Sequence, residues 1–179
     1  MPALRPFNNL LPKLGERVFV DPACQIIGDV LIGDDSSIWP GTIIRGDVNH
    51  IRIGARSNIQ DGTVIHVSHD GPDGKPVGYP TLIGDDVTIG HGAIIHACTI
   101  GDACLIGMGA IVLDGAVVEQ NGFVGAGAVI PPGKTVGSGE LWLGNPAKCV
   151  RRLSEQESAQ LYYSAAHYVR LKDMYLAET

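Results

Sequence analysis

The sequence is poor in aromatic and charged residues, which make up 6% and 18% of its 179 positions. It has no run of Lys and Arg, and its net charge of -6 argues against a nucleic-acid-binding surface. No apolar run approaches the roughly 18 residues that a membrane-spanning helix needs, and no charged-then-apolar leader opens the chain. We therefore expect a cytoplasmic protein with neither a membrane nor a nucleic-acid partner.

Cysteine is scarce, and its four positions form no Cys-x-x-Cys pair. They are Cys24, Cys98, Cys104 and Cys149. In a chain that is not exported, such cysteines are more often small buried apolar residues than disulfide partners, and we expect the same here. Glycine, in contrast, occurs 24 times, which suits a tight and repetitive turn architecture better than a helical globule.

A six-residue repeat is the strongest pattern in the chain. Each unit begins with an aliphatic residue, often followed by Gly or an acid, and carries a small residue four positions after the first. Units begin at Ile32, Ile38, Ile53, Ile59, Ile83, Ile89, Ile106, Val112, Val118 and Val124. Neither a helix nor an alternating strand has this period, whereas the hexapeptide parallel β-helix does. The sequence thus predicts an all-β solenoid with three units per coil, in which successive coils stack about 4.8 Å apart.

The chain is long enough to bury one core, so we expect a single domain over residues 1–179. An N-terminal arm at 1–17 precedes the β-helix at 18–150. Three extra residues near Val48 to Ile51 predict a small bulge. Residues 68–80, with three Gly and three Pro and no repeat, predict an excursion loop.

A C-terminal α-helix is predicted at 154–177. Ser154 with Glu157 forms a capping box at its start. Its apolar residues follow helical spacing and form one stripe, which should pack against the β-helix or a neighbouring subunit. They are Leu161, Ala165, Tyr168, Leu171 and Tyr175.

Two histidines, His66 and His96, are predicted to stack. If the unit at Ile83 succeeds the unit at Ile65, the chain between them contains 12 inserted residues, and without these His96 follows His66 by 18 positions. That separation is one full coil. The two imidazoles would lie on one face about 4.8 Å apart, a suitable spacing for gripping one metal ion.

A third histidine, His91, lies five positions before His96 and so belongs to a neighbouring face. It would reach the same ion from a second copy of the chain, which predicts a metal site at a subunit interface, most simply in a homotrimer. Gln60 and Asp61 precede His66 and could orient a metal-bound water. The alternative is that the histidines are ordinary surface side chains and that Gln60 and Asp61 form a simple turn.

These residues together resemble a known family. Its motifs here are Arg45-Gly46-Asp47, Asn58-x-Gln60-Asp61, His66, Gly90-His91-x4-His96 and Gly144-Asn145-Pro146-Ala147-Lys148. They look like those of the gamma-class carbonic anhydrase family, and most like its short-loop bacterial branch of YrdA type, over nearly the whole chain. The histidines with Gln-Asp are specific, whereas the repeat and the Gly-Asn-Pro-Ala turn are shared with many acyltransferases.

The resemblance implies a left-handed parallel β-helix and a homotrimer with zinc between its subunits, Fe2+ and Co2+ being other candidate metals. The implied activity is a lyase reaction, the reversible hydration of carbon dioxide to bicarbonate by a zinc-bound hydroxide. His66 and His96 would bind the metal from one subunit and His91 from its neighbour. Gln60 would hydrogen-bond the hydroxide.

Further residues take roles from the same resemblance. Arg45 and Asp47 would tie subunits together near the metal, with Arg45 also close to the reaction. Asp61 would lie behind the metal ligands. Tyr163, or its neighbour Tyr162, would reach the pocket from the helix, although core packing is an equally good explanation for either tyrosine.

The excursion loop departs from the family pattern. Members with a long acidic loop use a glutamate there to move protons, whereas this loop offers Asp70, Asp73 and His69. Histidine titrates near neutral pH, which makes His69 the candidate proton shuttle, unless it is an ordinary loop residue. The departure predicts low activity.

Two other functions stay open at this point. A hexapeptide acyltransferase, or a thioesterase acting on a coenzyme A thioester, would use a histidine as a base without a metal. A structural trimer would use the metal only to fasten its subunits. The stacked histidines, and the lack of a repeat-lined basic patch for the coenzyme's phosphates, favour the carbonic anhydrase interpretation.

Overall fold

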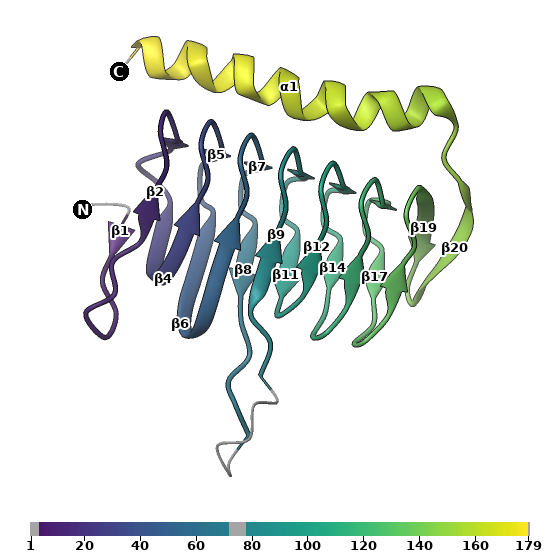
Figure 1. Cartoon of the computed structure of the whole chain (residues 1–179), viewed down its shortest axis with the longest axis horizontal. Helices are drawn as coiled ribbons and strands as arrows, with labels where there is room; N and C mark the ends of the chain where they lie inside the picture. The colour runs from purple at the N-terminus through teal and green to yellow at the C-terminus, as the bar shows by residue number, and fades with distance from the viewer. Residues whose placement is uncertain (1–3, 72–77, 179) are drawn as a thin grey trace.

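The computed structural model describes residues 4–71 and 78–178. Within them the chain is the predicted left-handed parallel β-helix of hexapeptide repeats, followed by one α-helix. Short strands follow one another around a three-faced prism, and the helix runs along the length of the prism (Figure 1).

The strands of successive coils pair in parallel and form the three faces. Face 1 contains β1 (Leu4–Arg5), β8 (Val64–His66), β11 (Ile94–His96), β14 (Ile111–Val112) and β17 (Val129–Ile130). Face 2 contains β2 (Lys13–Leu14), β9 (Thr81–Ile83), β12 (Thr99–Ile100), β15 (Val117–Val118) and β18 (Thr135–Val136). Face 3 contains β3 (Phe19–Val20), β5 (Ser37–Ile38), β7 (Asn58–Ile59), β10 (Thr88–Ile89), β13 (Leu105–Ile106), β16 (Phe123–Val124) and β19 (Glu140–Gly144).

Two longer strands, β4 (Gln25–Ile32) and β6 (Ile43–Ile53), cross from face 1 to face 2 and join them in one hydrogen-bonded sheet. Their pairing contains the predicted bulge. Gly28 lies opposite Gly46 and Val30 opposite Ile51, so residues 47–50 of β6 face only Asp29 of β4. The extra residues displace Asp47 from the regular repeat, and this carboxylate reaches the site described below.

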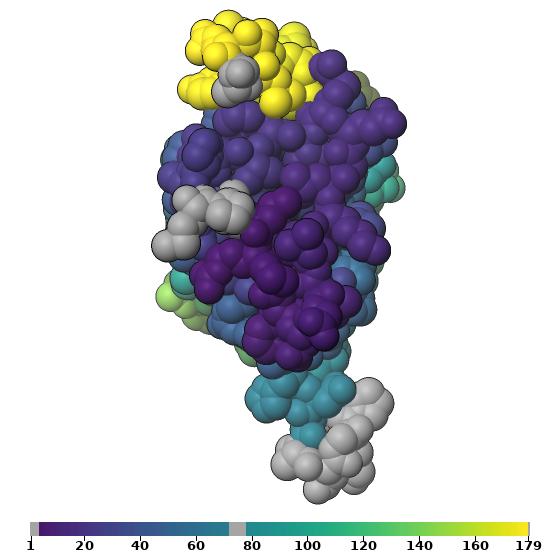
Figure 2. All heavy atoms as spheres, turned by 90° about the vertical axis from the view of Figure 1, so that its left-hand side faces the viewer, coloured from purple at the N-terminus to yellow at the C-terminus, as the bar shows by residue number. Residues whose placement is uncertain are grey.

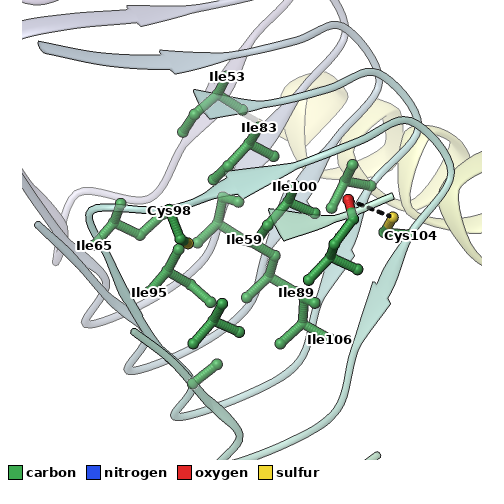
Figure 3. Packing of buried hydrophobic residues seen from close by; sticks show 14 of the residues in the cluster. Ile53, Ile59, Ile65, Ile83, Ile89, Ile95, Cys98, Ile100, Cys104 and Ile106 are labelled. Carbon is green, nitrogen blue, oxygen red and sulfur yellow. Dashed lines mark hydrogen bonds between the residues drawn. The ribbon is translucent and has the colours of Figure 1, made fainter. Parts of the chain in front are cut away.

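The interior of the prism is filled by the aliphatic residues that the repeat predicts. Ile59, for example, stacks between Ile38 and Ile89 of the adjacent coils, and all three side chains are 0% exposed. Figure 3 shows the same stacking along the neighbouring columns. Each side chain is covered by those above and below, so the hydrophobic effect favours one register throughout.

The cysteine prediction is right for three of the four positions. Cys24, Cys98 and Cys104 are buried and free, and burial raises the pKa of Cys98 and of Cys104 to about 12. Cys149 is exposed, which corrects the prediction for that residue. It lies in β20 (Ala147–Arg152), which pairs with β19 in an antiparallel hairpin after the last coil, and every residue of β20 after Ala147 is exposed.

The helix α1 (Glu155–Glu178) begins with the predicted capping box. The backbone N–H of Ser154 donates to the carboxylate of Glu157 at 2.9 Å, and the N–H of Glu157 donates to Ser154 Oγ at 3.2 Å. Arg151 also donates to Glu157, and these hydrogen bonds lower the pKa of Glu157 to about 2.

In residues 4–71 and 78–178, no helix combines the length and apolarity needed to cross a membrane.

The helix packs against its own β-helix, along β3, β5, β7 and β10 of face 3. Aromatic contacts form the centre of this packing: Trp39 lies 5.6 Å from Tyr168 and 5.1 Å from Tyr175 between ring centroids. Leu161 and Ala165 of the predicted stripe are buried.

Lys172 of the helix is also fully buried, which the apolar stripe did not predict. Its Nζ lies 2.7 Å from Asp35 and 2.6 Å from Asp173. The hydrogen bond from Lys172 holds the pKa of Asp35 below its ordinary value. Because a buried ammonium needs paired carboxylates, this cluster fixes the C-terminal half of the helix over the first coils.

The arm predicted at 1–17 takes part in the fold, since β1 and β2 both pair with β4. Residues 4–17 cover the N-terminal end of the prism, which faces the viewer in Figure 2. The described parts of the excursion loop project from the body of the β-helix (Figures 1 and 2). At the base of the loop, the Ser68 N–H donates to the Tyr79 carbonyl at 3.2 Å. The Tyr79 N–H donates to Ser68 Oγ at 2.9 Å. Asp73 lies outside the described residues.

Replacing Ile59 by Ala should lower the free energy of unfolding by about 2–5 kcal/mol, because the cavity would lie between fully covered neighbours. The measurement is urea denaturation at one fixed protein concentration. Leu31→Ala is the matched control: Leu31 is 43% exposed on β4, and its loss should change the same quantity by less than about 0.5 kcal/mol. Equal losses in both variants would contradict the stacked-core account.

Candidate metal centre

His66 and His96 occupy the same position in neighbouring strands. They end β8 and β11 and face each other directly in the parallel register, which confirms the predicted stacking. Each follows an isoleucine, Ile65 or Ile95, that is 0% exposed in the core. The buried isoleucines therefore hold both imidazoles at one corner of the prism, where His66 Nδ1 lies 3.2 Å from His96 Nε2.

Each of these imidazoles is oriented by a carboxylate. His66 Nε2 lies 2.9 Å from Asp47, and His96 Nδ1 lies 2.6 Å from Asp114. An ionised carboxylate only accepts, so these ring nitrogens carry the protons. In the neutral rings, the two nitrogens that face each other then both present lone pairs, an arrangement that a cation between them would satisfy.

The separation of the facing nitrogens suits zinc. Two nitrogens on a tetrahedral zinc ion, each about 2.0–2.1 Å from the metal, lie about 3.3 Å apart, close to the 3.2 Å between His66 and His96. A histidine that binds a metal usually donates its other N–H to a carboxylate, as both do here. The donor set therefore fits a divalent transition-metal ion.

The carboxylate of Asp47 has a second partner. Arg45, two residues earlier, forms an ion pair with it. Burial works against ionisation of Asp47, but hydrogen bonds from His66 and Arg45 hold its pKa below the ordinary value. Asp47 thus stays a carboxylate at neutral pH. Arg45 and Asp47, predicted as a tie between subunits, are paired here within one chain.

His91 lies at a different corner, in the turn that links β10 to β11. Gly92, which follows it, has a φ of 67°, a conformation that glycine adopts without strain and that lets the chain turn the corner. His91 Nδ1 lies 2.8 Å from Asp61 of the preceding coil. The ring is 46% exposed, so its Nε2 is available to an outside group.

Gln60 shares this second corner. Its side chain is 5% exposed, and its Nε2 donates to Asn58 Oδ1 at 3.1 Å. Asn58 in turn donates to Thr88 at 3.0 Å, and Thr88 donates to Ser164 of α1 at 3.1 Å. The network fixes the amide so that, among the described residues, Gln60 Oε1 has no partner and stays available.

A pocket of about 260 Å3 opens beside Gln60 and His91. Met108 and Leu105 form an apolar part of its wall, and Tyr168 and Ser164 cover it from the helix. A small apolar molecule could therefore lie next to the free atoms of Gln60 and His91.

The single chain thus presents two half-sites. We call them the two-histidine corner (Arg45, Asp47, His66, His96 and Asp114) and the one-histidine corner (Gln60, Asp61 and His91). In the part of the chain that the structure describes, no group of three His, Cys, Asp or Glu side chains converges on one metal position. The structure therefore brings His66 and His96 together and leaves His91 apart.

Several known proteins are similar to this chain in sequence and fold. The bacterial transferase hexapeptide (six repeats) model matches residues 12–46 and 97–132. Protein YrdA of Escherichia coli (strain K12) is 51% identical over 97% of this chain and 94% of its own length. Gamma carbonic anhydrase 2, mitochondrial, of Arabidopsis thaliana is 47% identical over 93% of this chain and 59% of its own length. The chain belongs to the gamma carbonic anhydrase-like hexapeptide family.

A solved structure supports the same placement in this family. It is a hexapeptide transferase family protein from Anaplasma phagocytophilum, 44% identical, with a TM-score of 0.89 over 96% of this chain and 97% of that one.

Other residues expected from the gamma carbonic anhydrase resemblance lie outside both corners. Tyr163 is 57% exposed, stacks on His167 at 6.3 Å and lies under the Arg170 guanidinium. Tyr162 is 46% exposed. His69 is exposed at the base of the excursion loop. None of the three lines the pocket beside Gln60 and His91, whereas Tyr168 does.

Sequence reasoning missed three residues of the corners and the adjoining pocket: Asp114, Ser164 and Tyr168. Asp114 had a usable signal, because it follows His96 by 18 positions, the same coil spacing that paired His96 with His66. Ser164 and Tyr168 had no such signal, since the way a helix rotates onto the prism depends on its packing.

Replacing Asp114 by Asn should weaken zinc binding about 10- to 100-fold, because His96 loses the carboxylate that orients it. Competition with a chromophoric chelator measures the affinity. Asp70→Asn is the control, because the Asp70 carboxylate accepts from the Gly78 N–H at 3.3 Å and is hydrogen-bonded to none of the three predicted metal ligands. An Asp114→Asn affinity equal to that of the parent would show that this carboxylate does not orient the ligand.

Proposed function

We propose that the protein is a metal-dependent lyase of the gamma carbonic anhydrase type, which hydrates carbon dioxide reversibly to bicarbonate. The observation that carries the proposal is the pair of complementary half-sites. One corner offers two facing imidazoles, and the other offers a third imidazole with a free Nε2 beside Gln60. Three imidazoles with one open position are the donor set of a catalytic zinc site.

The half-sites meet if copies of the chain assemble. Face 1 joins the two corners, and its outer surface carries a column of aliphatic side chains in register: Ile43, Val64 and Ile94, which are 42%, 38% and 42% exposed. An exposed apolar column of this kind favours contact with another chain. A head-to-tail contact that repeats through a three-fold axis closes a ring and completes three equivalent sites.

The residues of both corners then have distinct tasks. His66, His91 and His96 would hold the ion, and Asp47, Asp61 and Asp114 would keep each imidazole in the tautomer that leaves a lone pair for it. A bound divalent ion supplies a hydroxide at neutral pH, because it lowers the pKa of a coordinated water to near 7. Zinc suits imidazole ligands well, and Fe2+ and Co2+ are the alternatives.

Gln60 positions the reacting groups. The contact of its Nε2 with Asn58 orients the amide, so its Oε1 would accept a hydrogen bond from the nucleophile and would set the direction of attack on carbon dioxide. The apolar wall at Leu105 and Met108 suits a small apolar substrate. His69 stays the proposed proton acceptor, and a cytoplasmic location stays a prediction of the sequence.

Acyl transfer is the second candidate, because the matching family model and the Anaplasma phagocytophilum protein are both described as transferases. A transferase or thioesterase would use one histidine as a base and would keep its activity without metal. A structural trimer would bind metal without turnover. Metal dependence and carbon dioxide hydration therefore separate the three functions.

His91→Ala should remove the bound metal as completely as His66→Ala does, although the two residues lie at different corners. The physical reason is that each ion needs an imidazole from both corners. Metal content per chain, measured by emission spectrometry after gel filtration, tests this expectation.

His167→Ala is the control, because His167 stacks on Tyr163 on the outer side of α1. The parent should have three times the 18.9 kDa mass of one chain in solution. Unchanged metal content in His91→Ala, or a parent that is monomeric at micromolar concentration, would overturn the shared site.

Gln60→Ala should lower turnover about 10- to 100-fold while metal content and assembly stay intact, because the variant loses a positioning contact and no metal ligand. Stopped-flow hydration of carbon dioxide by metal-replete protein measures this effect.

Gln60→Glu keeps acceptor oxygens but loses the Nε2 donor to Asn58 Oδ1, so it tests whether the fixed orientation of the side chain matters as well as its acceptor. Equal turnover in Gln60→Ala and the parent would remove Gln60 from the mechanism. A parent that hydrates no carbon dioxide with any of the three metals would instead favour the structural trimer or acyl transfer.

A further inference from the structure

A second pocket lies at the C-terminal end of the β-helix, between the β19–β20 hairpin and the last coil. Its volume is about 360 Å3. Its wall includes Pro131, Lys134, Trp142, Pro146, Ala147 and Lys148. None of the described residues that line it belongs to either histidine corner, so the pocket is separate from the candidate metal centre.

Trp142 gives this pocket a rigid aromatic wall. Its Nε1 donates to Glu140 at 2.8 Å, and the ring packs against the hydrophobic core. Pro131 and Pro146 add further stiff apolar surface. Aromatic ligands bind well to such a surface, because a tryptophan side chain that is already fixed by a hydrogen bond offers a large aromatic face and loses little conformational entropy on binding.

The ammonium groups of two wall residues, Lys134 and Lys148, have no partner among the described residues. Both are exposed, and among the described lysine and arginine side chains only these two and Lys13 form no hydrogen bond, ion pair or ring contact. Two unpaired positive charges thus line one pocket of a chain whose net charge is -6. An anion bound in this pocket would be attracted to both charges.

We propose that this pocket binds a mononucleotide-like ligand, with its heteroaromatic ring on Trp142 and its phosphate between Lys134 and Lys148. A phosphate monoester carries nearly two negative charges at neutral pH, which matches two ammonium groups. A base stacked on an aromatic side chain strengthens binding by roughly tenfold or more. This inference rests on neither the metal nor the proposed lyase activity.

Cys149 offers a test on the unmodified chain, because it lines the same pocket and is exposed, while the other three cysteines are buried. Millimolar AMP should slow the reaction of Cys149 with a thiol reagent several-fold. Adenosine or inorganic phosphate alone, at equal concentration, should protect much less. No protection by AMP would overturn the proposal, and equal protection by phosphate would reduce the site to a simple anion site and overturn the ring contact.

Variants test the same pocket by calorimetric titration with AMP. Lys134→Gln combined with Lys148→Gln should weaken binding at least about tenfold, and added salt should weaken binding to the parent. Lys13→Gln, which removes the one other unpaired described lysine, should leave the affinity unchanged. Trp142→Leu should weaken binding, whereas Trp142→Phe keeps an aromatic face and should retain most of it. An equal loss in Lys13→Gln and the double variant would show non-specific attraction and sink the proposal.

Discussion

Parallel hydrogen bonding between successive coils is the constraint on which the rest of the structure depends. Each coil can bury its aliphatic residues only if they stack on those of the next coil, so the register is the same for every strand of a face. The polar residues at the corners inherit this register. It sets His66 beside His96 on one corner and Asp61 beside His91 on another. A slip of one residue would separate both pairs and expose the core.

The carboxylates give the corners their chemical character. Asp47, Asp61 and Asp114 each accept a hydrogen bond from one imidazole. The second nitrogen of each imidazole is then left with a lone pair that can bind another group. Because the corners lie at opposite edges of face 1, a single chain offers two lone pairs at one place and one at the other. The proposed lyase activity therefore depends on assembly, and the exposed aliphatic column of face 1 is the surface that assembly would cover.

The contacts that the sequence predicted and the contacts that it missed arise from different physical causes. The repeat predicted the core residues and the pairing of His66 with His96, because stacking makes neighbours of residues whose spacing can be counted. Asp114 obeyed the same count but was not recognised, since one aspartate in a turn is an ordinary surface residue. Lys172 does not fit the apolar pattern of the helix, and its burial depends on the ion pairs that it forms with two carboxylates.

By itself, the sequence determined the β-helix, its three-unit coil, the capped C-terminal helix and the column that holds two histidines. All of these follow from periodicity or from contacts between residues near in the repeat. Only the tertiary structure decided that Ser164 and Tyr168, and not Tyr163, cover the pocket beside His91. It also decided that Trp142 lies beside two unpaired lysines. These arrangements depend on how α1 and the β19–β20 hairpin pack against the prism. Side-chain packing, and not the hydrogen-bonded repeat, selects the orientation of both elements.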